Sequence, residues 1–298
     1  MANQDNWVKQ PTTEHVKQAS GLDMFRLRAG GAVCELYPGR GGLIGRFAVL
    51  DDEVLFLDPS TLANRRENVR GGISVLFPIA GRLTADRYQV QGQSSAYPMR
   101  PNGLARHAAW EIANIEQARV TQVFRSTPMS RVNFPFDFEV QMTVDLGRAG
   151  FRTLAIVLSV ENLGSNPMPV HLGLHPFFLV PEAERDRFRI EVDATTVHDQ
   201  LTGDLGPFDG HVDWTVPGVD LQLSDLQSQS LLLHVPGKTP RRITMSELFT
   251  TVVLWQTALQ DFVCVQPWSA PSDALNTGVC LRTLEPGDRL EGEIIVSV

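Results

Sequence analysis

Short runs of alternating apolar and polar residues recur along most of the chain, and turn residues separate them. Residues 24–28 alternate apolar and basic side chains, and residues 32–37 form a second run after Gly30 and Gly31. Two strand-like runs joined by a glycine pair predict a β-hairpin. Further strands are predicted at residues 87–91, 109–115, 120–125, 136–146, 151–162, 188–192, 230–235, 241–245, 251–255, 262–265 and 291–298.

Helical periodicity is nearly absent from the same sequence. Windows of ten or more residues with apolar side chains at i, i+3, i+4 and i+7 are lacking, and the 24 glycines and 19 prolines favour turns. Many short strands without intervening helices predict an all-β antiparallel sandwich or barrel rather than an α/β fold. Residues 202–219, rich in proline, glycine and aspartate, form the longest predicted loop.

The chain of 298 residues is long enough for two domains, but all-β sandwiches of this length often form one. We therefore expect a single domain over residues 21–298, preceded by a loose polar arm over residues 1–20. The arm lacks the apolar core of a signal peptide, and no stretch approaches the roughly 20 apolar residues of a membrane span. These features predict a cytoplasmic protein with no membrane partner.

Acidic residues outnumber basic ones, 34 to 26, which gives a net charge of −8. Such a chain has no general attraction to phosphate backbones, so nucleic acid is not an expected partner. Cys34, Cys264 and Cys280 are sparse, odd in number and without CxxC spacing. This pattern predicts reduced thiols rather than a disulfide framework or a zinc site. The oligomeric state stays open.

Two stretches in the first half of the chain are unusual for plain strands. In residues 67–78, Arg70 precedes Gly71 and Gly72, so the backbone could approach a ligand with the guanidinium beside it. The alternative is a surface turn with a solvated arginine. In residues 101–110, Asn102 begins a tight turn and Trp110 could stack on a sugar ring, or it could belong to the core.

Two more such stretches lie in the second half. In residues 171–178, His171 and His175 are expected on one face of a strand, but no further ligands nearby support a metal site. His175 is either a functional group with a backbone fixed by the following proline or a hydrogen-bonded core histidine. In residues 261–271, a buried strand ends in Gln266 and is followed by Pro267 and Trp268. Gln266 could face a cleft or bond to backbone inside the sandwich.

Taken together and in this order, the four stretches resemble the aldose 1-epimerase (galactose mutarotase) superfamily, and most closely its hexose-6-phosphate mutarotase-like branch. The likeness spans residues 25–298 and includes the closing segment 284–294. Residues 70–78 (RGGISVLFP) are similar to that branch's RGGIP..FP, 102–110 (NGLARHAAW) to its HGFAR...W, 175–178 (HPFF) to its HPYF, and 263–268 (VCVQPW) to its VCxEPW.

The resemblance implies an antiparallel β-supersandwich that interconverts the anomers of a hexose or hexose 6-phosphate without a cofactor or a metal. In the family, a base takes the proton of the anomeric hydroxyl and a histidine protonates the ring oxygen, so that the ring opens and recloses. By resemblance, His175 and Gln266 occupy the catalytic positions. The implied substrate-binding residues are Arg70 and Arg106, which would grip a sugar phosphate, with Asn102, Asp220 and Trp268.

Two departures from the family pattern affect the chemistry. The family's base is a glutamate, and Gln266 stands at that position; a carboxamide keeps the hydrogen bonds but has no usable basic lone pair near neutral pH. The family's HGFAR stretch begins with a histidine, and Asn102 stands there. His175 is therefore the one titratable catalyst that the motifs retain.

Three functions follow from these residues. The first is an active mutarotase, in which His175 acts as acid and water or a carboxylate such as Asp220 acts as base. The second is a sugar-binding or sugar-phosphate-binding protein without catalysis, because amides still bind hydroxyl groups. The third is a purely structural sandwich, which leaves the ordered motifs unexplained.

Overall fold

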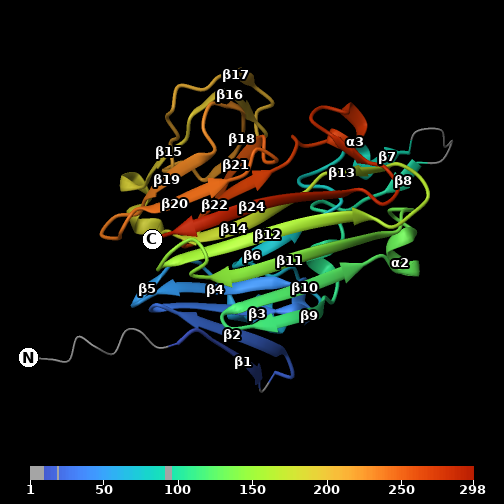
Figure 1. Cartoon of the computed structure of the whole chain (residues 1–298). Coiled ribbons are helices and arrows are strands. Elements are labelled where there is room, and N and C mark those ends of the chain that lie inside the picture. The colour runs from blue at the N-terminus through green and yellow to red at the C-terminus, as the bar shows by residue number, and fades with distance from the viewer. Residues whose placement is uncertain (1–9, 19, 91–95) are drawn as a thin grey trace, which may run out of the picture.

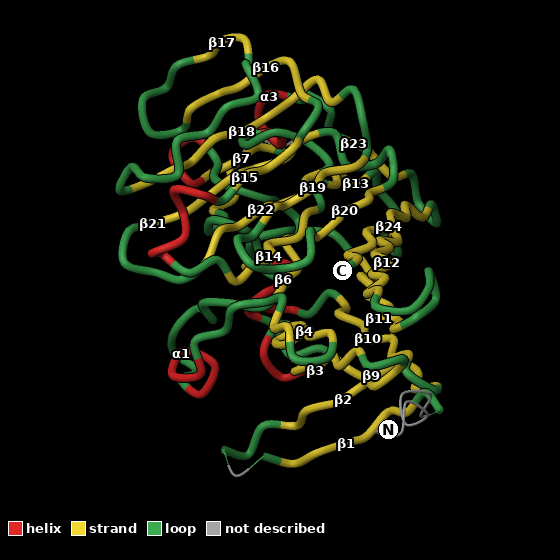
Figure 2. The backbone as a smooth tube through the Cα atoms, turned by 90° about the vertical axis from the view of Figure 1, so that its left-hand side faces the viewer, coloured by secondary structure: helices red, strands yellow, loops and turns green. Residues whose placement is uncertain are grey.

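The computed structural model describes residues 10–18, 20–90 and 96–298. Two large sheets face each other as layers (Figures 1 and 2), and every strand pair within them is antiparallel. This architecture confirms the predicted all-β antiparallel sandwich. The predicted loose arm over residues 1–20 is wrong for residues 12–17, which form an edge strand because His15 stacks on Phe25 of the next strand at 4.7 Å.

The larger sheet has twelve strands and runs from the N-terminal strands to the segment around residue 205. Its order is β1 (Thr12–Lys17), β2 (Asp23–Ala29), β3 (Ala32–Tyr37), β4 (Leu43–Val49), β6 (Ile73–Leu76), β14 (Gly173–Leu179), β22 (Phe262–Trp268), β21 (Thr251–Thr257), β18 (Gly218–Leu226), β16 (Ala194–Asp199) and β17 (Leu205–Pro207). The short β5 (Asp52–Glu53) pairs with β4.

The second sheet has eight strands. Its order is β15 (Arg189–Glu191), β19 (Ser230–His234), β20 (Arg241–Met245), β24 (Arg289–Ser297), β12 (Thr153–Asn162), β11 (Phe138–Leu146), β10 (Arg119–Arg125) and β9 (Glu111–Glu116). Two small two-stranded sheets complete the set: β13 (Met168–Val170) with β23 (Arg282–Leu284), and β7 (Arg87–Gln89) with β8 (Ala96–Pro98).

Helices in the described part of the chain are short and lie in connections. They are α1 (Pro59–Ala63), α2 (Pro128–Arg131) and α3 (Ala274–Thr277), with 3-10 turns η2 (Pro38–Arg40), η3 (Thr84–Asp86), η4 (Ala105–His107) and η5 (Glu182–Arg187). No helix among the described residues has the length and apolar character needed to cross a membrane.

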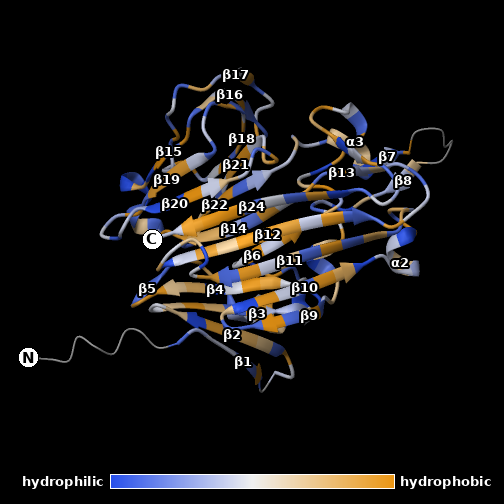
Figure 3. Ribbon diagram, in the orientation of Figure 1, coloured by the Kyte–Doolittle hydropathy of each residue, from blue (hydrophilic) through white to orange (hydrophobic). Residues whose placement is uncertain are grey.

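The core lies between the two large sheets and follows from strand alternation. In β11 every second residue is buried, and Figure 3 shows the matching hydrophobic and hydrophilic bands along β10, β11 and β12. The inward side chains of both sheets, such as Phe47, Phe77, Phe138 and Leu158, belong to one buried cluster. The side chains on the opposite face of the larger sheet's central strands do not belong to this core and can line a binding site.

Candidate functional site

The central strands of the larger sheet present one face to the core and the other to a pocket. In β22, Val263 and Val265 pack in the core, whereas Gln266 and Trp268 line the pocket. Period-two alternation produces this division. It also puts the following side chains on the pocket face: His175 and Phe177 of β14, Val253 and Trp255 of β21, and Asp220 and Gln222 of β18.

Strand register fixes how these side chains face one another. Gly173 pairs with Trp268 and Phe177 with Cys264, so the residues midway between them, His175 and Gln266, stand opposite each other. Opposed residues have Cβ atoms about 4.5–5.5 Å apart. The sheet therefore puts an imidazole and a carboxamide side by side on the pocket floor.

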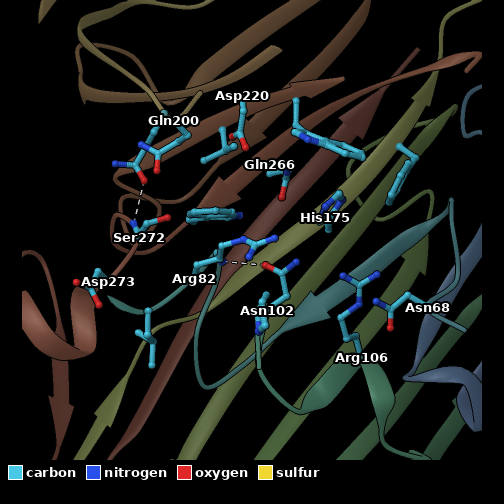
Figure 4. A pocket seen from close by; sticks show the side chains of 18 of the residues that line it. Asn68, Arg82, Asn102, Arg106, His175, Gln200, Asp220, Gln266, Ser272 and Asp273 are labelled. Atoms are coloured by element: carbon cyan, nitrogen blue, oxygen red, sulfur yellow. Dashed lines mark hydrogen bonds between the residues drawn. The ribbon is translucent and has the colours of Figure 1, made fainter. Parts of the chain in front are cut away.

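Asp220 occupies a more distant place on the same floor. It pairs with Trp255, which in turn pairs with Cys264. Cys264 precedes Gln266 by two residues on β22, so Asp220 is offset by two residues from the row of paired residues that contains Gln266. The order β14, β22, β21, β18 separates Asp220 from His175 by three strand steps, or about 14 Å between backbones. In Figure 4, Gln266 lies between Asp220 and His175. Asp220 and His175 are too far apart to contact each other directly, but one bound molecule could contact both.

The pocket encloses about 600 Å³ between this floor and several connecting segments (Figure 4). That volume equals about 20 water molecules at liquid density, more than a hexose with its twelve heavy atoms displaces. Four segments form the walls, and Gln200 adds to them. Their lining residues are Asn68, Val69 and Arg70; Gly81, Arg82, Leu83 and Thr84; Pro101, Asn102 and Arg106; and Ser272 and Asp273.

All seven predicted site residues line this one pocket: Arg70, Asn102, Arg106, His175, Asp220, Gln266 and Trp268. Their assigned roles remain predictions, but their convergence is a finding. The imidazole of His175 and the guanidinium groups of Arg70 and Arg106 thus come from distant parts of the chain to one pocket.

His175 is 8 % exposed and held between aromatic rings. It stacks on Phe177 at 4.6 Å and meets Trp255 edge-on at 5.9 Å. Burial, and then the charge of Arg106, lower the pKa of His175 to about 3. The imidazole is therefore neutral at pH 7 and has one nitrogen lone pair for accepting a proton.

Gln266 is 3 % exposed, and its Oε1 has no hydrogen-bond partner in the described part of the protein. A buried carbonyl oxygen without a partner is costly, so its position on the pocket floor indicates a ligand contact. The alternative that Gln266 bonds to backbone inside the sandwich does not hold for this oxygen. A ligand hydroxyl group would satisfy it.

Asp220 is half-buried and is the pocket carboxylate without an internal hydrogen bond to its oxygens among the described residues. Burial, and then the charge of Asp199 on the neighbouring strand, raise the pKa of Asp220 to about 6, while Arg82 opposes the shift. The other pocket carboxylate, Asp273, accepts from Thr84 N, Thr84 Oγ1 and Asn276 Nδ2. Asp220 is therefore the pocket carboxylate whose oxygens are available to accept hydrogen bonds from a ligand.

Three arginines give the pocket a cationic lining although the whole chain carries a net charge of −8. The guanidinium groups of Arg70, Arg82 and Arg106 form no ion pair or hydrogen bond within the described ranges. Burial lowers the pKa of Arg106, which still stays protonated at neutral pH. Guanidinium groups without internal partners suit the oxygens of an anionic ligand.

Asn102 uses part of its polar capacity to hold the pocket wall. Its backbone lies in the left-handed region at φ 65°, which asparagine tolerates, and its Oδ1 accepts from Gly81 N at 2.8 Å. The amide nitrogen is left as a donor. Asn102 can hold a ligand oxygen but cannot shuttle a proton.

Two of the aromatic and histidine candidates belong to the core instead. Trp110 is 4 % exposed and donates from Nε1 to the Ala105 carbonyl, so it does not line the pocket. His171 lies before β14 rather than on it, and its ring meets the edge of Trp268 at 6.1 Å. β14 begins at Gly173, so the expectation that His171 and His175 share one strand face stays a prediction; of the two, His175 lines the pocket.

Sequence reasoning missed several lining residues. Gln222 had a usable signal, since it lies two residues after Asp220 on the same strand and so shares its face. Trp255 had the same kind of signal in β21. Arg82 follows Gly81 in a connecting segment, and Gln200 lies in a turn after β16, where no periodicity applies.

No cluster of three or more His, Cys, Asp or Glu side chains that could hold a metal ion occurs among the described residues. The groups that line the pocket are an imidazole, carboxamides, the Asp220 and Asp273 carboxylates, guanidinium groups and aromatic rings. Such a mixture binds hydroxyl groups by hydrogen bonds and a sugar ring by aromatic contact.

Comparison with known proteins identifies the family. The family model for aldose 1-epimerase matches residues 23–297. The chain belongs to the aldose 1-epimerase family. The Slr1438 protein of Synechocystis sp. PCC 6803 is similar over 100 % of this chain and 99 % of its own, with 30 % identity and a TM-score of 0.85.

Two further proteins are similar at lower identity. A galactose mutarotase-like protein of Lactobacillus casei is 20 % identical over 92 % of this chain and 99 % of its own, with a TM-score of 0.76. The uncharacterized protein YihR of Escherichia coli is 21 % identical over 72 % of this chain and 74 % of its own. The family membership supports an epimerase-like protein that binds a small sugar, and the hexose-6-phosphate mutarotase-like branch remains a prediction.

Proposed function

We propose that this aldose 1-epimerase family member interconverts the anomers of a hexose, with preference for one that carries an anionic group such as a 6-phosphate. The observation that carries the proposal is His175 opposite Gln266 on the floor of a pocket lined by three guanidinium groups without internal partners. One end of the pocket suits a ring-opening proton transfer, and its walls suit an anion.

The sheet geometry favours one orientation of the sugar. The anomeric carbon and ring oxygen would lie over His175 and Gln266, and the hydroxyl edge would reach toward Gln222 and Asp220, about three strand spacings away. A 6-phosphate, attached next to the ring oxygen, would then lie beside Arg106 and Arg70. Arg106 is the cation whose charge acts on His175, which supports this placement.

His175 would move the proton in this arrangement. Neutral imidazole accepts the proton of the anomeric hydroxyl, directly or through water, as the C1=O1 double bond forms and the C1–O5 bond breaks. The resulting imidazolium gives the proton to O5, which carries the electron pair of the broken bond. After rotation about C1–C2, the reverse steps close the ring on the other face. Gln266 would hydrogen-bond to the sugar oxygen whose charge changes during these steps.

This arrangement has limited catalytic power. Asp220 is too far from His175 to share its proton directly, so it is better suited to binding hydroxyl groups than to acting as base. The imidazolium intermediate forms in a buried place, beside Arg106 and opposite an uncharged amide; burial first, and then the charge of Arg106, lower the pKa of His175 and so disfavour this intermediate. We therefore expect a slow mutarotase.

Sugar binding without catalysis is the second candidate, and the carboxamide of Gln266 favours it. NMR exchange between anomers separates the two functions, with glucose, galactose, glucose 6-phosphate and glucuronate as substrates. The proposal expects exchange above the buffer rate, fastest with an anionic sugar. Saturable binding by calorimetry without any acceleration would establish the second candidate, and neither binding nor acceleration would exclude both.

A further inference from the structure

The two pocket arginines predicted to bind an anion come from separate segments, and one turn touches both. Arg70 lies near the end of the loop Asp58–Gly71, which contains α1, and Arg106 lies in η4. The turn η2 with Gly41 and Gly42 lies between these segments. Neither Arg40 nor its neighbours line the pocket.

Arg40 holds the loop of Arg70 through a single nitrogen. Its Nη2 donates to the carbonyl oxygens of Thr61, Asn64 and Glu67 at 2.9, 3.0 and 3.1 Å. These three carbonyls lie at successive points of the loop, so one guanidinium group links three parts of the loop to one another. The stretch from Thr61 to Glu67 has no regular sheet hydrogen bonds, and the Asn64 carbonyl accepts a backbone hydrogen bond from Glu67 N at 3.2 Å as well as the one from Arg40. Arg40 therefore supplies donors for loop carbonyls that no sheet ladder pairs.

The same loop fixes the backbone of Arg70. Arg70 N donates to Thr61 Oγ1 at 2.9 Å, and Thr61 Oγ1 donates to the Asp58 carbonyl at 2.9 Å. Asp58 N donates to the Arg70 carbonyl at 2.9 Å. The residue whose carbonyl Arg40 binds most closely, Thr61, is thus the residue that positions Arg70.

The other side of the turn holds Arg106. Gly41 N donates to the Ala108 carbonyl at 3.0 Å, and Trp110 N donates to the Pro38 carbonyl at 3.0 Å. A Cβ on Gly41 would lie 2.2 Å from the Arg106 carbonyl oxygen, so only glycine permits this approach. The turn therefore contacts the backbone of Arg106 directly and that of Arg70 through Arg40.

We propose that Arg40 is a positioning residue that ties the loop Asp58–Gly71 to the turn beside η4, so that Arg70 and Arg106 bind one anionic group together. The inference rests on the proposed function, since it assigns a cause to the anion preference. Two guanidinium groups on separate loops can act on one anion only when their spacing is fixed, because the cost of ordering them otherwise falls on binding.

The test compares affinities for glucose 6-phosphate and glucose, measured by calorimetry together with KM and kcat from NMR exchange. Arg40→Gln should raise the Kd and KM for glucose 6-phosphate about tenfold, as when one of two charge-assisted contacts is misplaced. Glucose binding and kcat should change less than about twofold, because His175 and Gln266 lie on the sheet. Arg40→Lys should restore most of the preference, since an ammonium has three donors at one point.

Further variants keep the result decisive. Arg46→Gln is the matched control. It removes the ion pair between Arg46 of β4 and Glu53 of the adjacent strand β5, and it should leave the preference for glucose 6-phosphate over glucose unchanged. Thr61→Val should weaken glucose 6-phosphate binding in the same direction if Arg40→Gln folds poorly. A wild-type protein without anion preference would refute the proposed anionic substrate. A wild-type preference that Arg40→Gln and Thr61→Val both retain would refute the role of Arg40 alone.

Discussion

The two ends of the pocket floor hold one titratable group each, and their surroundings differ. His175 lies on a central strand between aromatic rings. Burial and the charge of Arg106 lower its pKa to about 3, so the imidazole is uncharged near neutral pH. Asp220 lies two strands from the sheet edge, where burial and Asp199 raise its pKa to about 6. Both settings favour the neutral form, but only Asp220 changes charge near physiological pH. The comparison assigns proton transfer to one end and hydroxyl binding to the other.

Replacing each group in turn gives the largest expected effect. His175→Asn should lower kcat about 10²- to 10⁴-fold, the range for a positioned proton transfer, and leave KM nearly unchanged. Asp220→Asn should mainly raise KM for glucose, because it removes a charged hydroxyl acceptor without touching the proton path. NMR exchange rates over a range of substrate concentrations measure both constants.

The division of roles has a clear failure condition. Asp273→Asn is the matched control for Asp220→Asn, since Asp273 lines the same pocket but is bonded to Thr84 and Asn276. If Asp220→Asn lowers kcat as much as His175→Asn does, Asp220 takes part in proton transfer and the distance argument is wrong.

The fold was accessible from sequence because strand alternation is local. The predicted segments at 241–245, 120–125 and 230–235 match β20, β10 and β19 to within a residue at each end. Several strands were missed, among them β4, β6 and β18. The first two are buried at nearly every position and show no alternation, and the start of β18 falls within the predicted loop 202–219.

The candidate site was accessible for a different reason. Its seven residues came from resemblance to ordered motifs, and they converge because the sheet order brings β14, β22, β21 and β18 together. The pairing of β14 with β22, which joins Gly173 to Trp268, is a contact between distant parts of the sequence that local patterns do not report. Arg82 and Gln200 sit on connections without periodicity, so only the folded chain identifies them as lining residues.

A carboxylate opposite His175 would sharpen the contrast between the two ends. Gln266→Glu should increase kcat by at least about tenfold, because a carboxylate can accept the hydroxyl proton and raises the pKa of an adjacent imidazole. The NMR assay at pH 7 detects the gain. Gln222→Glu makes the same chemical change in the same row, two strands farther from His175, and should give no gain. An unchanged rate for Gln266→Glu would mean that proton transfer does not limit the native site.

The smallest expected effect is a pH dependence that separates KM from kcat. With glucose, which has no titrating group in this range, KM should fall several-fold as pH rises through about 6, because ionised Asp220 accepts hydroxyl hydrogen bonds more strongly. After subtraction of the buffer rate, kcat should stay flat between about pH 5 and 8, since His175 is already neutral there. Asp199→Asn removes the negative charge that helps to raise the pKa of Asp220, so the change in KM should move to lower pH. At pH 5 this variant should therefore bind glucose about twofold more tightly than the wild type. In Asp220→Asn the dependence of KM on pH should vanish, and a KM that still changes near pH 6 in that variant would assign the titration to another group.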